Sequence, residues 1–293
     1  MKQIDTCPVC NNSEFLPFLN CVDYTVSRET FSIVSCKNCG FKFTNPRPAD
    51  ADLGKYYKSE NYISHSNTKK GIVNYLYQTV RKYTLGKKLN LINSLNQKGK
   101  LLDIGCGTGE FLNTCKMDGW ETTGVEPDPD ARALGIKNYG INVLQEEALK
   151  TLPEAGFDII SMWHVLEHVP NLNERVGELK KLLKPSGSII IAVPNCSSKD
   201  AIDYKAFWGA YDVPRHLWHF TPKDIKALFS SQGMKVEQIL PMKFDSFYVS
   251  LLSEKYKTGS TNLVRGFLSG LSSNMAATKT GNTWSSQIYT IKK

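Results

Sequence analysis

Residues 101–111 read LLDIGCGTGEF and join a short apolar run to three glycines at alternate positions. Glycine lets the backbone turn sharply, and such a turn between a strand and a helix N-terminus brings backbone N–H groups close to a ligand. The spacing is Asp-x-Gly-x-Gly-x-Gly, whereas dinucleotide-binding folds use Gly-x-Gly-x-x-Gly. Asp103 precedes the glycines, where a carboxylate can meet a ligand ammonium, so the motif predicts a ligand that is cationic at one end.

Short apolar runs alternate with segments of helical periodicity from Lys100 to Leu240. This alternation predicts an α/β fold in which right-handed crossovers build a doubly wound parallel sheet. The expected strands are residues 100–104, 122–125, 141–144, 157–163, 188–193 and 235–240, and the expected helices are 109–118, 128–138, 171–184 and 222–232. Asp128 and Thr221 stand at capping positions, each followed by a proline suited to the first helical turn.

Glu126 is the second residue that points to a ligand. It ends the second expected strand in the stretch GVEPD, 21 residues after Gly105. An acceptor-only carboxylate at that edge suits the two ribose hydroxyls of a nucleoside. Taken alone, Glu126 beside Pro127 is better read as an exposed loop residue, but the glycine loop makes the binding role the favoured interpretation.

With these residues the chain resembles the class I S-adenosylmethionine-dependent methyltransferases over about residues 99–240. The resemblance implies a Rossmann-like seven-stranded sheet. It also implies that the methionine part of the cofactor is held by Asp103, Gly105, Cys106, Gly107 and Gly109, and the ribose by Glu126, with Pro127 beside it. Many relatives place an Asp after the third strand to meet the adenine amine. This chain has LQEEALKTLP there, so Glu146, Glu147 or backbone takes that place.

The fourth expected strand runs into MWHVLEHVPN, which resembles a subset of this family with a His-Val-Leu-Glu-His motif. Ligands of open parallel sheets bind beyond the carboxyl ends of the strands, which puts His164 near the reacting centre and in contact with the cofactor. His164 is a candidate base or a wall of the pocket. Glu167 and His168 fall on the next turn, where capping and packing are the favoured roles.

A second histidine cluster, YDVPRHLWHFTP at residues 211–222, joins the fifth strand to the next helix. Arg215, His216, His219 and several aromatic rings in one loop over the same sheet edge predict an acceptor pocket. Histidines packed in the core are the alternative. Histidine is the side chain best suited to exchange a proton near neutral pH, and His216, directly after Arg215, is the first candidate for a general base.

Residues 1–48 contain Cys7-Pro-Val-Cys10 and Cys36-Lys-Asn-Cys39-Gly, two knuckles separated by 25 residues. Four thiolates from two tight turns can close a tetrahedral zinc site with no open position for substrate, so a structural zinc ribbon is predicted. A redox pair is the rival, but redox motifs do not come as two matched knuckles. Cys21 is not expected to be a ligand.

The remaining segments flank the core. Residues 49–98 contain Tyr56, Tyr57 and Tyr62 in a stretch resembling the lid of zinc-ribbon methyltransferases, and one of them is expected to lie over the cofactor. A helix at about 69–96 follows, which either lies on an anionic membrane or, as we favour, packs on the sheet. Residues 241–293 are expected to form a helical cap, with helices at 245–256 and 263–271 and a final strand at 284–291.

Charge is unevenly distributed along the 293 residues. The net charge is 36 − 28 = +8, made up of +7 in residues 1–98, −4 in 99–240 and +5 in 241–293. Basic flanks suit an anionic partner such as a phosphate, a lipid surface or RNA, although solvated lysine-rich faces explain them equally well. No run approaches the roughly 20 apolar residues of a membrane span, and the first residues lack the apolar core of a signal peptide, so we expect a cytoplasmic protein.

The expected function is methyl transfer from S-adenosylmethionine to a small-molecule, sugar or lipid-linked biosynthetic intermediate. An RNA base methyltransferase with a zinc-binding recognition module is the first alternative, but the chain lacks an Asn-Pro-Pro-Tyr type motif after the fourth strand. A non-catalytic cofactor-binding protein is the second. The sequence leaves open whether oxygen, nitrogen or carbon is methylated, and it leaves the oligomeric state open.

Overall fold

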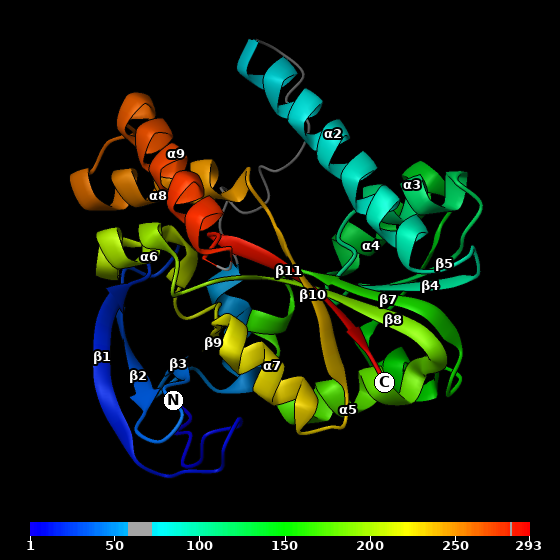
Figure 1. Ribbon diagram of the computed structural model, residues 1–293, viewed down its shortest axis with the longest axis horizontal. Helices are drawn as coiled ribbons and strands as arrows, with labels where there is room; N and C mark the ends of the chain where they lie inside the picture. The colour runs from blue at the N-terminus through cyan, green and yellow to red at the C-terminus, as the bar shows by residue number, and fades with distance from the viewer. Residues whose placement is uncertain (58–71, 282) are drawn as a thin grey trace.

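The computed structural model describes residues 1–57, 72–281 and 283–293 and is built around a seven-stranded sheet (Figure 1). The sheet order is β10-β11-β8-β7-β4-β5-β6. Its strands are β4 (Lys100–Ile104), β5 (Glu121–Val125), β6 (Asn142–Leu144), β7 (Phe157–Trp163), β8 (Leu183–Pro194), β10 (Lys235–Pro241) and β11 (Ser286–Lys292). The doubly wound α/β sheet predicted from the sequence is confirmed.

One strand departs from the predicted parallel sheet. β4 to β8 run parallel, whereas β11 lies antiparallel between β8 and β10. The segment that connects β10 to β11 returns to the sheet at the end where β10 stops. β11 must therefore run in the direction opposite to β10.

Five helices accompany this sheet: α2 (Ile72–Leu95), α3 (Glu110–Met117), α4 (Pro129–Tyr139), α5 (Leu172–Leu182) and α7 (Pro222–Ser230). The predicted caps are present. The Asp128 carboxylate accepts from the Asp130 N–H at 2.9 Å, and Thr221 forms a capping box with Asp224. α5 ends at Leu182, earlier than predicted, because Pro185 cannot continue a helix and Leu183 already pairs with Phe157.

A smaller antiparallel sheet forms the N-terminal module. It consists of β1 (Phe15–Val22), β2 (Thr30–Cys36), β3 (Lys42–Thr44) and β9 (Trp218–His219), in that order. β9 belongs to the histidine-rich loop of the core, and it pairs with β3 through Phe43 opposite Trp218. The module therefore takes its fourth strand from the loop that we predicted to form the acceptor pocket.

The C-terminal segment inserts a helical hairpin, α8 (Asp245–Thr258) and α9 (Leu263–Thr280), between β10 and β11. Both predicted helices are present, and α9 runs beyond 271 because small residues keep its inner face packed until the left-handed Gly281 ends it. A further helix, α6 (Lys199–Tyr204), follows β8 and contacts α8 and α9. Five short 3₁₀ helices complete the elements of the described residues: η1 (Asp50–Tyr57), η2 (Glu146–Thr151), η3 (Leu166–His168), η4 (Lys205–Phe207) and η5 (Gly209–Tyr211). Among the helices described, none has the length and apolar character needed to cross a bilayer.

A buried guanidinium ties the module to the core. Arg215, 1% exposed, lies 2.6 Å from an Asp212 carboxylate oxygen and 3.0 Å from one of Asp23, and it donates to the Tyr56 carbonyl at 2.8 Å. Burial opposes ionisation of Asp23, but the Ser27 N–H and Arg215 together lower its pKa. One side chain thus joins the module, η1 and the histidine-rich loop.

We expect Arg215→Met to lower the free energy of unfolding by about 3–5 kcal/mol, because it leaves the Asp23 carboxylate buried without its cation. Urea unfolding measures the change. The matched control is Lys181→Met, which removes the exposed ion pair with Glu154 and should cost less than about 1 kcal/mol. Equal losses in the two variants would contradict this account of the fold.

Candidate active site

The glycine loop after β4 has the backbone that its sequence predicts. Gly105, Gly107 and Gly109 have φ angles of 72°, 55° and 80°, in the left-handed region. A Cβ on Gly105 would lie 2.4 Å from Val165 Cγ2, so only glycine fits there. A Cβ on Gly107 would meet nothing within 4 Å, so the loop is open at this point.

Glu126 is buried and belongs to the same loop structure. Its Oε2 accepts from the Gly107 N–H at 2.8 Å, and its Oε1 accepts from the Asp128 N–H at 3.0 Å. Burial raises the pKa of Glu126, although both N–H groups oppose the shift. Pro127 follows directly, and its carbonyl accepts from Arg132 at 2.8 Å. The structure therefore brings together the glycine loop and the acid that the sequence placed there.

Asp103, 2% exposed, is the last but one residue of β4 and lies two residues before Gly105. Its Oδ1 accepts from Ser161 Oγ at 2.6 Å. Burial raises the pKa of Asp103 to about 7, against the Ser161 hydrogen bond and the attraction of Lys88. A ligand cation beside this carboxylate would favour its charged form.

Lys88 is a member of the site that the sequence did not reveal. It extends from α2, and its Nζ lies 4.1 Å from the ring centroid of Trp163 and 5.5 Å from that of Phe111. Burial lowers the pKa of Lys88, while Asp103 and Asp245 oppose the shift. The Lys88 ammonium therefore lies over the Trp163 ring at the end of β7, and the Asp103 carboxylate attracts it.

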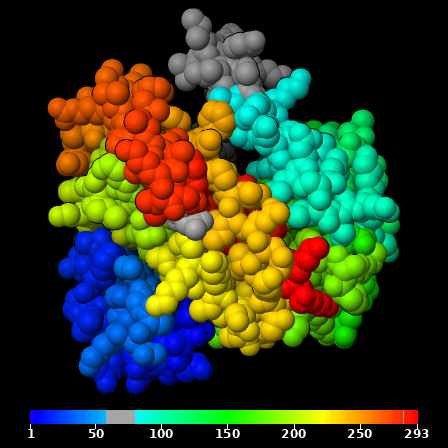
Figure 2. All heavy atoms as spheres, viewed as in Figure 1, coloured from blue at the N-terminus to red at the C-terminus, as the bar shows by residue number. Residues whose placement is uncertain are grey.

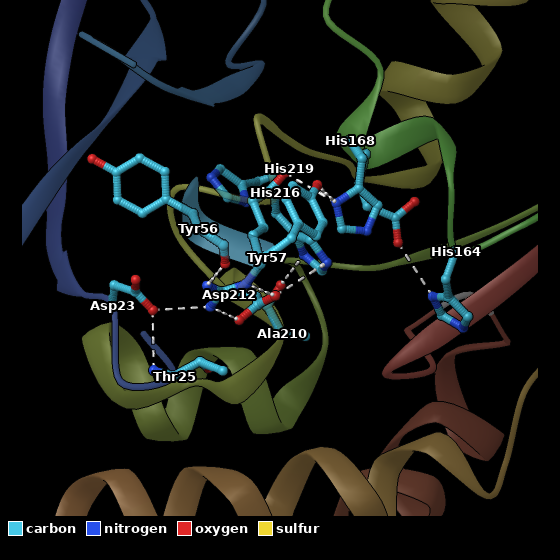
Figure 3. Close-up of polar contacts among 12 residues, drawn as sticks. Asp23, Thr25, Tyr56, Tyr57, His164, His168, Ala210, Asp212, His216 and His219 are labelled. Atoms are coloured by element: carbon cyan, nitrogen blue, oxygen red, sulfur yellow. Dashed lines mark hydrogen bonds and ion pairs between the residues drawn. The ribbon is translucent and has the colours of Figure 1, made fainter. Parts of the chain in front are cut away.

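His164 follows β7 with φ 57° and is held at both ring nitrogens. Nδ1 lies 3.3 Å from Glu167 Oε1 (Figure 3). Nε2 lies 2.9 Å from Asp245 Oδ2 at the start of α8. Burial opposes the charged ring, but the Asp245 and Glu167 carboxylates raise the pKa of His164 to about 10. The two carboxylates therefore favour the imidazolium form of His164.

His216 and His168 lie edge to face with ring centroids 4.6 Å apart (Figure 3). The Ala210 carbonyl lies 2.8 Å from His216 Nδ1, and the Arg215 carbonyl lies 3.0 Å from His168 Nδ1. Each carbonyl accepts a hydrogen bond from Nδ1–H, so in the neutral tautomer of either ring Nε2 is the acceptor nitrogen. Burial and the neighbouring His216 lower the pKa of His168 to about 4.

Glu167, His168 and His216 each bring one ligand atom within 4.8 Å of the others, a spacing that a metal ion could bridge. Oε2 of the buried Glu167 has no hydrogen-bond partner among the described residues. The other oxygen of the Glu167 carboxylate, Oε1, contacts His164 Nδ1, so Glu167 connects this cluster to His164.

The other predicted residues lie elsewhere. His219 is buried, with Nε2 3.2 Å from Thr44 Oγ1, and burial lowers its pKa well below the usual value, so it is a core histidine. Glu146 forms an ion pair with Arg175, and Glu147 is exposed on η2. Tyr57 Oη lies 2.9 Å from His168 Nδ1, whereas Tyr62 is outside the described residues.

The four cysteines of the two knuckles converge, with all four sulfurs within 4.8 Å of one another. Sγ of Cys7 lies 3.6 Å from that of Cys39, and Sγ of Cys10 lies 3.5 Å from that of Cys36. Tetrahedral zinc with bonds of about 2.3 Å requires sulfurs about 3.8 Å apart, so the donor set fits zinc. Cys21 is buried in a separate apolar cluster.

Comparison with known proteins assigns the family. A family described as a methyltransferase domain matches residues 77–239, more than half of the chain. The chain therefore belongs to the methyltransferase-domain family. It is a class I S-adenosylmethionine-dependent methyltransferase.

Individual relatives are distant. Ubiquinone biosynthesis O-methyltransferase of Rickettsia bellii is 24% identical over 203 residues, covering 64% of this chain and 82% of that protein. The enzyme of the same name from Photobacterium profundum is 30% identical over 109 residues, covering 34% and 46%. A solved S-adenosylmethionine-dependent methyltransferase from Archaeoglobus fulgidus has a TM-score of 0.51 and 23% identity, covering 73% of this chain and 94% of that one. That structure supports the fold.

The charge of His164 can be tested by its titration. We expect an NMR pH titration to give a midpoint near 10, because two carboxylates hold the imidazolium. The pKa is raised above its usual 6.5, so the charged ring stabilises the fold fully below that pH, and this stabilisation is lost as pH rises through about 10.

Asp245→Asn should lower the midpoint of His164. His168 serves as the internal control, since burial lowers its pKa to about 4 and its signals should not move near neutral pH. A midpoint for His164 at the usual value of 6.5 would contradict the assignment.

Proposed function

We propose that this enzyme transfers the methyl group of S-adenosylmethionine to a small-molecule, sugar or lipid-linked biosynthetic intermediate. The observation that carries the proposal is the buried Glu126 carboxylate hydrogen-bonded to the open Gly107 turn, at the same end of the sheet as the histidine cluster. The relatives named for ubiquinone biosynthesis support a small acceptor methylated on oxygen.

The cofactor site in this proposal uses the residues of the loop. Asp103 holds the ammonium of the methionine part, together with Gly105, Cys106, Gly107 and Gly109. Glu126 accepts from the ribose hydroxyls, because its Oε1 and Oε2 each retain lone pairs beyond the backbone bonds that orient them. Pro127 lies beside the ribose.

The two catalytic candidates, His216 and His164, have different roles in this proposal. His216 accepts the proton of an acceptor hydroxyl at Nε2, since Nδ1 is committed to the Ala210 carbonyl. His164 is already protonated and paired, so it serves as a charged wall of the pocket near the cofactor. This arrangement refines the sequence-based prediction, which left a base or a wall open for His164.

The N-terminal cysteines hold a structural zinc in this proposal, and the enzyme works in the cytoplasm. Zinc bound by Cys7, Cys10, Cys36 and Cys39 would fix the turn before β1 and the turn between β2 and β3. Because β3 pairs with β9, the metal would stabilise the loop that carries His216. Tyr57, beside His168, is the described candidate for the lid residue over the cofactor.

The function is tested with methyl-labelled S-adenosylmethionine and three extract fractions: polar metabolites, lipids and total RNA. We expect label in the metabolites or lipids. Label confined to RNA would favour the RNA methyltransferase, and no label despite cofactor binding would favour a non-catalytic protein.

Two variants separate cofactor binding from proton transfer. His216→Asn should reduce methyl transfer about a hundredfold with the cofactor Kd unchanged, because it removes the proton acceptor. Glu126→Gln should instead weaken cofactor binding about tenfold, because a charged hydrogen-bond acceptor is lost. Wild-type rates in His216→Asn would remove His216 from the mechanism.

Metal analysis tests the ribbon. We expect one zinc per chain in freshly purified reduced protein, and chelation should destabilise the module. Cys10→Ser should lose the zinc, whereas Cys21→Ala, a buried cysteine outside the cluster, should keep it. Protein purified without any zinc would refute the assignment.

A further inference from the structure

The α8–α9 hairpin packs through small residues. Gly266 and Gly270 face α8 so closely that a Cβ on Gly266 would lie 2.6 Å from Leu251 and one on Gly270 would lie 2.8 Å from Phe247. Ser273 and Ala277 continue this buried face along α9. Large side chains are therefore excluded from the side of α9 that meets the protein.

The large apolar residues of α9 point outward instead. Leu263, Val264, Phe267, Leu268, Leu271 and Met275 are all exposed and recur at helical spacing; we refer to them as the apolar stripe. Residues 244–275 hold eight of the 17 exposed large hydrophobic side chains among the described residues. The hairpin lies at an edge of the molecule (Figures 1 and 2). The Phe267 ring stacks on Phe247 of α8 at a centroid distance of 5.2 Å, and the stripe still forms an exposed apolar surface.

The charge around this surface is mostly positive. The exposed charged side chains of residues 243–281 are all basic: Lys243, Lys255, Lys257, Arg265 and Lys279. On the neighbouring α6, Asp203 lines the same hollow as Arg265 and Leu268, and it pairs with Lys199. Residues 243–281 contain two carboxylates, and both turn inward. Asp245 pairs with His164, and the buried Glu254 accepts from Tyr204 Oη at 2.9 Å.

We propose that the apolar stripe docks onto an anionic phospholipid bilayer, with its large side chains among the acyl chains and the basic residues at the head groups. An exposed apolar face on a hairpin whose own exposed charges are basic has the composition of an interfacial helix. A second copy of this chain fits less well, since a twofold contact would place the same lysines and Arg265 against each other.

The apolar stripe is a different surface from that of the helix at 69–96. For that helix the sequence offers contact with an anionic membrane only as the alternative to packing on the sheet. It also lies next to the active site, because Asp245 at the start of α8 holds His164. Resting on the proposed function, the docked enzyme would receive a lipid-linked acceptor directly from the bilayer.

The test is co-sedimentation of the full-length protein with vesicles, without cofactor. We expect binding to an equal mixture of phosphatidylcholine and phosphatidylglycerol that weakens with salt, and little binding to phosphatidylcholine alone. Val264→Ser with Leu268→Ser, at side chains 68% and 55% exposed, should lower the partition coefficient about tenfold.

The matched control is Leu134→Ser with Ile136→Ser, which removes apolar side chains 46% and 49% exposed on α4 and should leave partitioning unchanged. Arg265→Gln with Lys279→Gln should also weaken binding about tenfold. Cofactor affinity measured without vesicles reports separately on the proposed function.

Three outcomes would overturn the proposal: equal binding to both vesicle types, an equal effect of the stripe and control variants, or a dimer in sedimentation velocity that the stripe variant abolishes. The last would assign the surface to a second copy of the chain.

Discussion

The Arg215 guanidinium is the contact on which the arrangement of the site depends. It neutralises carboxylates from the N-terminal module and from its own loop, and it binds a carbonyl of η1. The Arg215 carbonyl in turn accepts from His168, and His216 is the next residue along the chain. The orientation of both histidines therefore depends on an ion pair that reaches across 192 residues to Asp23. The ion pair between Arg215 and Asp23 and the pairing of β3 with β9 join the same two segments, the N-terminal module and the histidine-rich loop. The two contacts therefore support each other.

Features whose causes are local could be predicted from the sequence. The glycine loop, Glu126 and the caps at Asp128 and Thr221 depend on backbone conformation and on partners a few residues away. Glu126 bonds Gly107, 19 residues distant, but successive parallel strands place their carboxyl ends side by side, which periodicity alone predicts. The convergence of the cysteines follows in the same way from two tight turns of known geometry.

Features that depend on distant partners could not be predicted. The charge of His164 is set by Asp245, 81 residues later in a segment whose placement no motif indicates. His216 and His219 occur in one short loop, yet β9 turns His219 into the core while His216 faces the cluster. Lys88 reaches Trp163, whereas its neighbour Lys87 lies over Tyr83. One residue of helical rotation separates these two lysines, and nothing in their sequence context distinguishes them.

The hairpin shows that helical periodicity can locate a helix without fixing which of its faces is buried. Apolar residues at helical spacing normally mark the buried face of a helix, and their spacing in residues 263–271 predicts a helix of the cap. In α9, however, the alternative face carries glycine, serine and alanine, which permit a closer approach to α8 than leucine or phenylalanine could. Close backbone packing at Gly266 and Gly270 fixes the rotation of the helix, and the large side chains must then face away from the protein. These side chains stay exposed in the described chain, and the mostly basic residues around them favour an anionic surface as the partner that we propose.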